Sequence, residues 1–187
     1  MAFKQTKQAN IRSLAFDKKD EDKFLVTASK YIKVMTVKGN KLEASGGNYD
    51  KKGKPKDVKK ESKFQLCVSE FRGTGYVSGN SVGHIVTWSK DGSRQACFTG
   101  HKGKGPCHCV FAGEKYVVSG GIGLVIMYDL SLKPLKQWEI PRECVTSVSF
   151  DSEGTVMKII AGLNFTLNPH PTWHSCGPFY GSCPDHS

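Results

Sequence analysis

The chain has 187 residues, of which 38% are hydrophobic and 24% are charged, so it is long enough to bury a core and too apolar for a disordered protein. It holds 27 lysines and arginines against 17 aspartates and glutamates, and this net charge of +10 favours an acidic partner. Its first residues lack the apolar run of a secretory signal, and no stretch approaches the roughly 18 apolar residues of a membrane span. We therefore expect a cytoplasmic protein without membrane attachment.

A short cassette of one apolar and two small residues occurs four times after residues 1–9, which we take as an N-terminal extension. Its copies are Val26-Thr27-Ala28, Val77-Ser78-Gly79, Val118-Ser119-Gly120 and Ile160-Ala161-Gly162. After a longer first interval, the copies recur at the period of about 40–45 residues that is typical of WD-type propeller blades. Each copy follows a strand-like run, and these runs cover residues 11–16, 64–71, 107–112 and 144–150.

A third run follows each of the first three cassettes, and a fourth short segment completes most units. The third runs cover residues 31–37, 84–88 and 124–129, and the fourth segments include residues 94–100 and 135–140. Four strands per unit is the composition of a propeller blade. We expect the small residues of the second strand to lie near the crowded central axis. The aromatic residues Trp88 and Tyr128 of the third strand are expected to fill the space between blades.

The sequence thus predicts an all-β fold, an incomplete WD40-like β-propeller of about 3.5 four-stranded blades over residues 10–163. The blades are expected at residues 10–45, 64–100, 101–142 and 143–163. Propellers close with about 4–8 blades, so closure of this one would need further blades or another chain.

Residues 164–187 break the pattern and are predicted to form an irregular tail rich in cysteine, histidine and proline. The tail holds residue types that bind zinc, but their spacing fits none of the familiar zinc fingers, so we expect no metal site. These residues are His170, His174, Cys176 and Cys183.

Parts of the third unit resemble the Gly-His and Trp-Asp signature of WD repeats. They are Gly100-His101 ahead of the unit, Ser119 in its second strand and Tyr128-Asp129 at the end of its third strand. In that family the histidine, the serine and the aromatic residue belong to a hydrogen-bonded structural set. The resemblance therefore implies structural roles for Ser78, Trp88, His101, Ser119, Tyr128 and Asp129.

Longer strings resemble the first propeller of the echinoderm microtubule-associated-protein-like family, over about residues 10–150. The strings are FLVTASKYIKV (24–34), KGKPKDVKKESKFQLCVSEF (52–71), YVSGNSVGHIVTWSKDG (76–92), GHKGKGPCHCVF (100–111) and KYVVSGGIGLVIMYD (115–129). The resemblance implies association with microtubules, with the acidic surface of tubulin as the partner, and a location on the cytoskeleton.

A basic loop at residues 46–63 separates the first two units and is our candidate for the partner-binding site. A flexible, lysine-rich loop attracts acidic surfaces through long-range, salt-sensitive forces, although it could equally serve as a solvated loop. Its lysines are Lys51, Lys52, Lys54, Lys56, Lys59, Lys60 and Lys63. Nucleic acid is the rival partner, but the chain has no aromatic-interleaved binding motif, finger spacing or recognition helix, so we expect none.

No catalytic residue or cofactor is expected. The glycine-rich stretches 100–105 and 120–123 complete no phosphate-binding pattern and open no predicted helix, so we interpret them as turns. Cys107 and Cys109 should point with Phe111 into the blade packing, because alternate residues of a strand share a face. Five of the seven cysteines are interpreted as reduced core residues, namely Cys67, Cys97, Cys107, Cys109 and Cys144.

We therefore expect a non-catalytic WD-repeat scaffold that associates with microtubules. The alternative is a generic WD-repeat adaptor that binds other proteins and has no affinity for tubulin.

Overall fold

The computed structural model describes residues 11–28, 31–45, 65–101, 103–150, 156–163 and 179–182. All of its regular secondary structure is β-strand, so the all-β prediction is confirmed. The lysine-rich loop at residues 46–63 and the candidate zinc ligands of the tail lie outside the described residues. Within the tail the structure describes residues 179–182, which form a strand rather than irregular chain.

The strands form three antiparallel sheets that follow one another along the chain. The first sheet has the order β1 (Ile11–Asp17), β2 (Asp20–Ala28), β3 (Tyr31–Lys38) and β4 (Lys41–Ser45). The second has the order β5 (Gln65–Phe71), β6 (Gly75–Asn80), β7 (His84–Ser89) and β8 (Arg94–Thr99). The third joins β9 (Cys107–Ala112), β10 (Val117–Tyr128), β11 (Pro134–Phe150), β12 (Val156–Leu163) and β13 (Phe179–Ser182).

The third sheet holds more than one blade because β10 and β11 each fold back. In a straight strand Ser119 and Tyr128 would lie about 30 Å apart, at roughly 3.3 Å per residue. Their hydroxyl oxygens are instead 3.2 Å apart, so β10 is a hairpin that turns beside Gly123, where φ is +69°. Likewise, residues 134–139 of β11 pair with β10, whereas residues 143–150 pair with β12. A four-stranded blade is therefore followed by the start of another.

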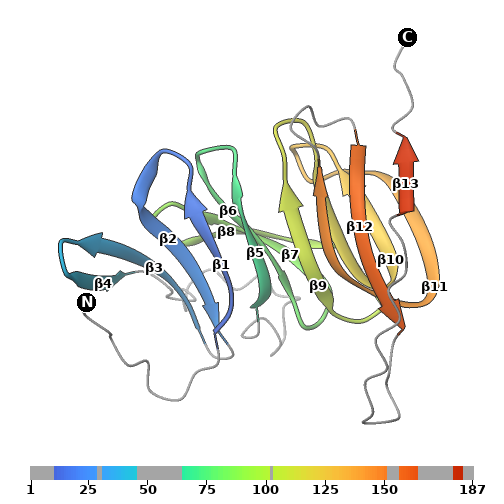
Figure 1. Cartoon of the computed structure of the whole chain (residues 1–187), viewed down its shortest axis with the longest axis horizontal. Helices are drawn as coiled ribbons and strands as arrows, with labels where there is room; N and C mark the ends of the chain where they lie inside the picture. Colours follow the sequence, from blue (N-terminus) through green and yellow to red (C-terminus); the bar gives the residue numbers. More distant parts are fainter. Residues whose placement is uncertain are drawn as a thin grey trace.

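The sheets are arranged as an open arc, which confirms the incomplete propeller. Figure 1 shows the sheets fanning out from β1, β5 and β9, the first strands of successive units. β1 contacts β5, and β5 contacts β9, whereas the last strands of each sheet lie at the outside. The first strand therefore lies nearest the axis, and our prediction that the second strand does so was wrong.

The small residues of the second strand have a different cause, which is the close approach of the next sheet. A Cβ atom added to Gly79 would lie 2.3 Å from the Cys107 sulfur, and one added to Gly120 would lie 2.4 Å from a methyl group of Val145. Real Cβ contacts are never this short. Glycine on one blade thus makes room for the first strand of the following blade.

Strand pairing also corrects the alignment of the cassettes. Leu14 pairs with Val26, Val68 with Ser78, Val110 with Ser119 and Val148 with Ile159. Val26 and Ile159 therefore occupy the position of Ser78 and Ser119, which we had assigned to Thr27 and Ala161. The cassettes were aligned by residue size alone, whereas the register is set by the turns and by which side chains face the neighbouring sheet.

A β-bulge near the start of the first strand recurs in every unit. The register shifts in the first strands lie between Ile11 and Ser13, between Gln65 and Cys67, between Cys107 and Cys109, and between Val145 and Ser147. In the third unit the extra residue is His108, so Cys107 and Cys109 face opposite sides of the sheet. The predicted shared face therefore holds for Cys109 and Phe111 and fails for Cys107.

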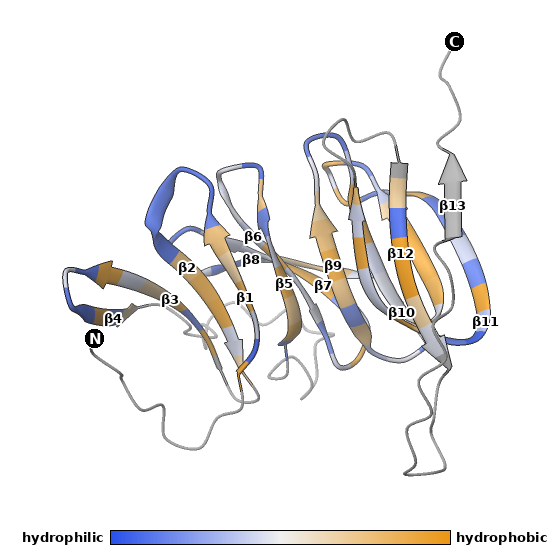
Figure 2. Ribbon diagram, in the orientation of Figure 1, coloured by the Kyte–Doolittle hydropathy of each residue, from blue (hydrophilic) through white to orange (hydrophobic). Residues whose placement is uncertain are grey.

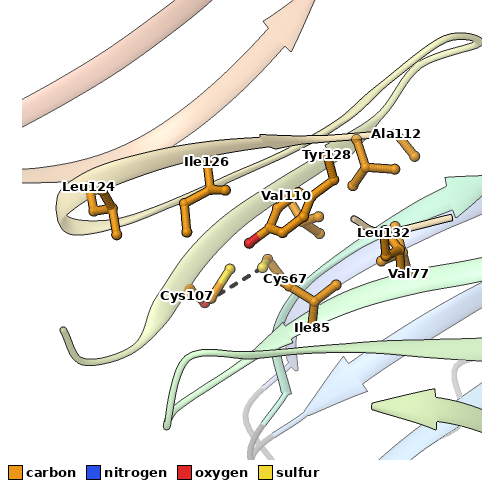
Figure 3. Close-up of a cluster of buried hydrophobic side chains, with 11 residues drawn as sticks. Cys67, Val77, Ile85, Cys107, Val110, Ala112, Leu124, Ile126, Tyr128 and Leu132 are labelled. Atoms are coloured by element: carbon orange, nitrogen blue, oxygen red, sulfur yellow. Dashed lines mark hydrogen bonds between the residues drawn. The ribbon is translucent and has the colours of Figure 1, made fainter. Parts of the chain in front are cut away.

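Buried apolar side chains fill the spaces between consecutive sheets. Figure 3 shows the cluster between the second and third sheets, where Cys67, Val77 and Ile85 meet Val110 and other residues of the third sheet. Figure 2 shows hydrophobic residues along most of the strands, with hydrophilic residues gathered at several turns. Because each side chain of this size contributes about 1.5–3 kcal/mol when fully buried, the contacts between sheets hold the arc together.

Replacing Gly120 by alanine should lower the free energy of unfolding by about 1–3 kcal/mol, because the new methyl group would overlap Val145 and Cys109. Urea unfolding of both proteins measures the difference. Gly162→Ala is the matched control, since a Cβ at Gly162 meets no atom within 4 Å. Equal stability of the Gly120→Ala variant and the parent chain would refute the close approach.

Candidate functional site

Three polar side chains of the second unit form one buried hydrogen-bonded chain. The Trp88 indole Nε1 donates to the Ser78 hydroxyl at 2.8 Å, and this hydroxyl donates to the Gln65 side-chain oxygen at 2.7 Å. All three residues are buried. The chain joins the first, second and third strands of one sheet and leaves none of these groups for an external ligand.

The third unit repeats this arrangement with different partners. His101 Nε2 and the Ser119 hydroxyl are 2.8 Å apart, and the same hydroxyl is 3.2 Å from the Tyr128 hydroxyl. The His101 backbone N–H donates to the Gly83 carbonyl at 2.7 Å, which attaches the histidine to the second sheet. Asp129 accepts from the backbone N–H groups of Ser131 and Lys133 and so holds the turn that follows.

Burial sets the protonation of these groups. Burial, with a smaller contribution from the charge of His108, lowers the pKa of His101 to about 4. Burial raises the pKa of Tyr128 to about 12, against the opposing effect of its hydrogen bond to Ser119. Both side chains are therefore uncharged at neutral pH, which suits a structural contact inside an apolar interface.

The buried thiols are equally unsuited to nucleophilic chemistry. The Cys67 thiol donates to the Cys107 carbonyl, and the Cys109 thiol donates to the Val145 carbonyl, each at 3.6 Å. Burial raises the pKa of Cys109 to about 12, and the adjacent Cys67 thiol together with burial raises the pKa of Cys107. The Cys107 and Cys109 thiols thus stay protonated. The thiols of Cys67 and Cys109 each span one blade junction. Within the described part of the chain, no three metal-ligating side chains are grouped together, and no helix could cross a membrane.

Three turns at one end of the arc do form a pocket of about 280 Å³. It is lined by Lys18 and Lys19 between β1 and β2, by Arg72 and Gly73 between β5 and β6, and by Gly113 and Glu114 after β9. Three of its four charged side chains are cationic, and these three are exposed. The pocket therefore presents positive charge on turns that come from three successive sheets.

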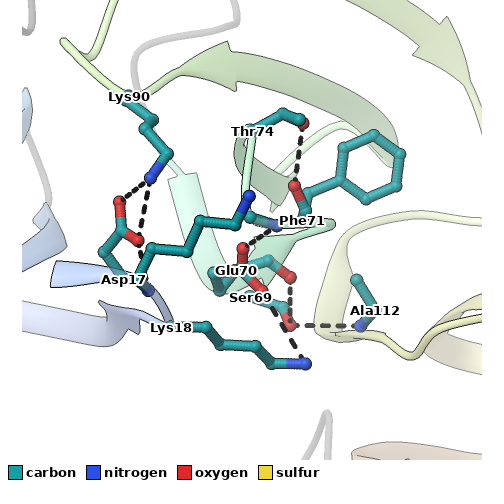
Figure 4. A network of polar contacts seen from close by, with 10 residues as sticks. Asp17, Lys18, Ser69, Glu70, Phe71, Thr74, Lys90 and Ala112 are labelled. Atoms are coloured by element: carbon teal, nitrogen blue, oxygen red, sulfur yellow. Dashed lines mark hydrogen bonds and ion pairs between the residues drawn. The ribbon is translucent and has the colours of Figure 1, made fainter.

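Ion pairs and hydrogen bonds between the first two sheets fix these turns (Figure 4). Lys90 of the second sheet lies 2.8 Å from the buried Asp17 carboxylate, which also accepts from the Lys19 backbone N–H at 2.8 Å. Burial alone would raise the pKa of Asp17, but these donors hold it below the usual value. The buried Glu70 carboxylate lies 3.9 Å from the Lys18 ammonium and accepts from the Gly73 backbone N–H.

Sequence reasoning missed this pocket. The cations of the pocket come from two places far apart in the chain, Lys18-Lys19 and Arg72. Neither place stands out in the sequence as a run of basic residues. The available signal is positional, because each lies in the turn after the first strand of its unit. Equivalent turns meet at the same end of neighbouring blades. The candidate loop at residues 46–63 leaves β4 at Ser45 and enters β5 at Gln65, the end of β5 opposite the pocket.

The fold and its buried polar sets define a WD-repeat β-propeller segment. Two solved structures are similar to it, each with a TM-score of 0.63. One is the WD40 propeller domain of Doa1, at 8% identity over 83% of this chain and 49% of that chain. The other is Chaetomium thermophilum Sqt1 bound to the N-terminus of the ribosomal protein L10, at 14% identity over 81% of this chain and 41% of that chain.

In sequence, the chain resembles echinoderm microtubule-associated protein-like proteins. It is 30% identical to human echinoderm microtubule-associated protein-like 2 over 123 residues, which are 64% of this chain and 18% of the relative. It is 28% identical to mouse echinoderm microtubule-associated protein-like 1 over 149 residues, which are 76% of this chain and 17% of the relative. The chain therefore spans less than a fifth of the length of these relatives. No family model matches the chain.

The protonation of His101 predicts a pH dependence of stability. In the unfolded state a histidine has a pKa of about 6.5 and binds a proton below this pH, whereas in the folded state His101 binds one only near pH 4. The free energy of unfolding should therefore fall by about 2 kcal/mol through this group as the pH is lowered from about 7 to about 5.

His101→Gln keeps a donor for Ser119 and removes the titration, so urea unfolding of this variant should depend less on pH than that of the parent chain. His108 is present in both proteins, and the difference between them isolates His101. Parallel pH profiles would contradict the buried, uncharged histidine.

Proposed function

We propose that the protein is a non-catalytic WD-repeat scaffold of the cytoplasm that associates with microtubules through basic turns and loops. The proposal draws on the resemblance to proteins that are named as microtubule-associated. It also draws on the polar residues of the repeats, which are occupied by contacts within and between blades. Such a protein acts by holding surface loops on a rigid frame.

The observation that carries the proposal is the cationic pocket at the turn end of the arc. The buried Asp17 carboxylate accepts from the Lys19 backbone N–H, and the buried Glu70 carboxylate pairs with Lys18 and accepts from the backbone N–H of Gly73, which follows Arg72. The turns that carry the three cations are therefore fixed before a partner arrives. An acidic side chain of a partner would fit between them, and preorganised cations lose less entropy on binding.

The lysines of the loop at residues 46–63 supply a second basic region. We propose that this loop steers the acidic tubulin surface over a distance, whereas the pocket makes the close contact. Both regions favour an acidic protein over nucleic acid, because the sequence holds no aromatic-interleaved motif of the kind that binds bases.

Co-sedimentation with microtubules tests the proposal. Replacing the pocket cations together, Lys18→Ser, Lys19→Ser and Arg72→Asn, should weaken binding about tenfold, and binding of the parent chain should fall as salt is raised. Replacing the seven loop lysines by serine should also weaken binding. These lysines are Lys51, Lys52, Lys54, Lys56, Lys59, Lys60 and Lys63.

The matched control removes three exposed lysines elsewhere, Lys41, Lys133 and Lys136, and should bind like the parent chain. An equal loss in this control would mean that net charge alone attracts the protein. Absence of pelleting by the parent chain would leave the protein as a WD-repeat adaptor for other partners.

A further inference from the structure

The backbone of Arg72, one of the cations of the pocket, has a left-handed conformation. Its φ is +57° and that of Gly73 is +62°, and the Thr74 backbone N–H donates to the Phe71 carbonyl at 3.1 Å. The Thr74 hydroxyl donates to the same carbonyl, also at 3.1 Å (Figure 4). A turn with two left-handed central residues prefers asparagine followed by glycine, and another side chain at the first position costs about 1 kcal/mol or more. The chain thus carries an arginine where asparagine would be favoured.

Contacts within the protein do not explain this arginine. Of the described residues other than glycine, Arg72, Leu132 and Arg142 have a positive φ. Leu132 is 5% exposed and belongs to the apolar cluster between the second and third sheets, so its burial offsets the strain. Arg72 is exposed, and the structure records no ion pair or hydrogen bond of its side chain with any residue that it describes. The guanidinium group is therefore available to a partner.

A lysine of the first sheet lies directly against the turn that carries Arg72. A Cβ atom added to Gly73 would lie 2.7 Å from the Lys19 Cε atom and 3.3 Å from its Nζ atom. Real Cβ contacts are essentially never shorter than 3.0 Å, so the lysine side chain lies across the bare backbone of the glycine. Cations from two successive sheets thus line the pocket side by side.

The charges that line the pocket match those of one carboxylate. The Lys18 ammonium lies 3.9 Å from the buried Glu70 carboxylate, which balances its charge. The other charged residues of the lining are Lys19, Arg72 and Glu114, which leave one net positive charge. A carboxylate would neutralise this charge, whereas a phosphate group carries about two negative charges at neutral pH. The charge balance therefore favours a carboxylate.

We propose that Arg72 is the residue with which the pocket binds a glutamate or aspartate side chain of a partner protein. Its guanidinium would donate two parallel N–H groups to the two carboxylate oxygens, which a lysine cannot do, and Lys19 would add its charge. This proposal rests on the proposed binding of an acidic partner and adds the residue that recognises the carboxylate. The strained conformation serves binding, because the fold holds the arginine at the pocket before a partner arrives.

Binding of a fluorescent decapeptide of glutamate, measured by anisotropy at about 0.1 M salt, tests the proposal together with urea unfolding. Arg72→Lys keeps the charge and the strained backbone but removes the two parallel donors. It should weaken binding about fivefold and leave the urea midpoint unchanged. Arg72→Asn should weaken binding at least as much and raise the midpoint by about 0.5 M, because asparagine tolerates a left-handed backbone.

The choice of carboxylate over phosphate has its own arm. A decapeptide in which five phosphoserines alternate with glycine carries about the same charge as the glutamate peptide. It should bind more weakly, because two negative charges on one group exceed the single net positive charge of the pocket. Tighter binding of the phosphoserine peptide would overturn the proposal.

Arg142→Asn is the matched control. Arg142 is also exposed and left-handed, with φ of +68°, but it lies in the bend of β11 and is not among the residues that line the pocket. Its replacement removes the same charge, so this variant should gain stability and bind the glutamate peptide like the parent chain. Equal loss of binding in Arg142→Asn and Arg72→Asn would overturn the proposal, since net charge alone would then explain the binding.

Two further results would contradict the role of Arg72, namely a parent chain that does not bind the glutamate peptide and an Arg72→Lys variant that binds it like the parent chain. Pelleting with microtubules separates this inference from the proposed function. A chain that binds the peptide through Arg72 but does not pellet would support the inference and refute association with microtubules. Pelleting of the parent chain and of Arg72→Lys to the same extent, with equal binding of the peptide, would refute the inference alone.

Discussion

The close approach of one sheet to the first strand of the next is the constraint on which the structure depends. Glycine at positions 79 and 120 leaves room for Cys107 and Val145, and the thiols of Cys67 and Cys109 donate to the carbonyls of those same residues. Larger residues would hold the sheets apart and forfeit the dispersion contacts of the clusters between them. The arc is therefore held by a contact that repeats from blade to blade.

Polar residues inside these apolar junctions fix the register of each blade. Ser78 and Ser119 hold equivalent positions, and each joins an aromatic residue of the third strand to a polar group from another segment. An unpaired hydroxyl or indole N–H there would cost about 1–3 kcal/mol, so slipped pairings are penalised. This explains why a buried histidine and several cysteines serve structure rather than reaction chemistry.

Much of the fold could be predicted from the sequence, because small and aromatic residues recur at the length of one blade. The all-β class, the strand runs and the open arc follow from this recurrence. The position of Val26 could not be predicted, since residue size suggested Thr27 whereas the register depends on the turn after Asp17. The face on which Cys107 lies could not be predicted either, because the bulge at His108 leaves no clear sign in the alternation of apolar and polar residues along the strand.

The candidate site was harder to predict than the fold. The density of lysine at residues 46–63 is visible in the sequence, but the pocket of Lys18, Lys19 and Arg72 exists only because blade packing brings separate turns to one end. The left-handed conformation of Arg72 was not evident for a similar reason, since it depends on the turn that the pairing of β5 with β6 imposes.

A double-mutant cycle across one blade junction tests the repeated contact most directly. Gly79→Ala, Cys107→Ala and the double variant are compared with the parent chain by urea unfolding, since the added Cβ would lie closest to the Cys107 sulfur. We expect the alanine at position 79 to lower the free energy of unfolding by less once the sulfur is removed, with a coupling of about 1 kcal/mol or more. Costs that add to within about 0.5 kcal/mol would show that the two residues do not meet and would contradict the account.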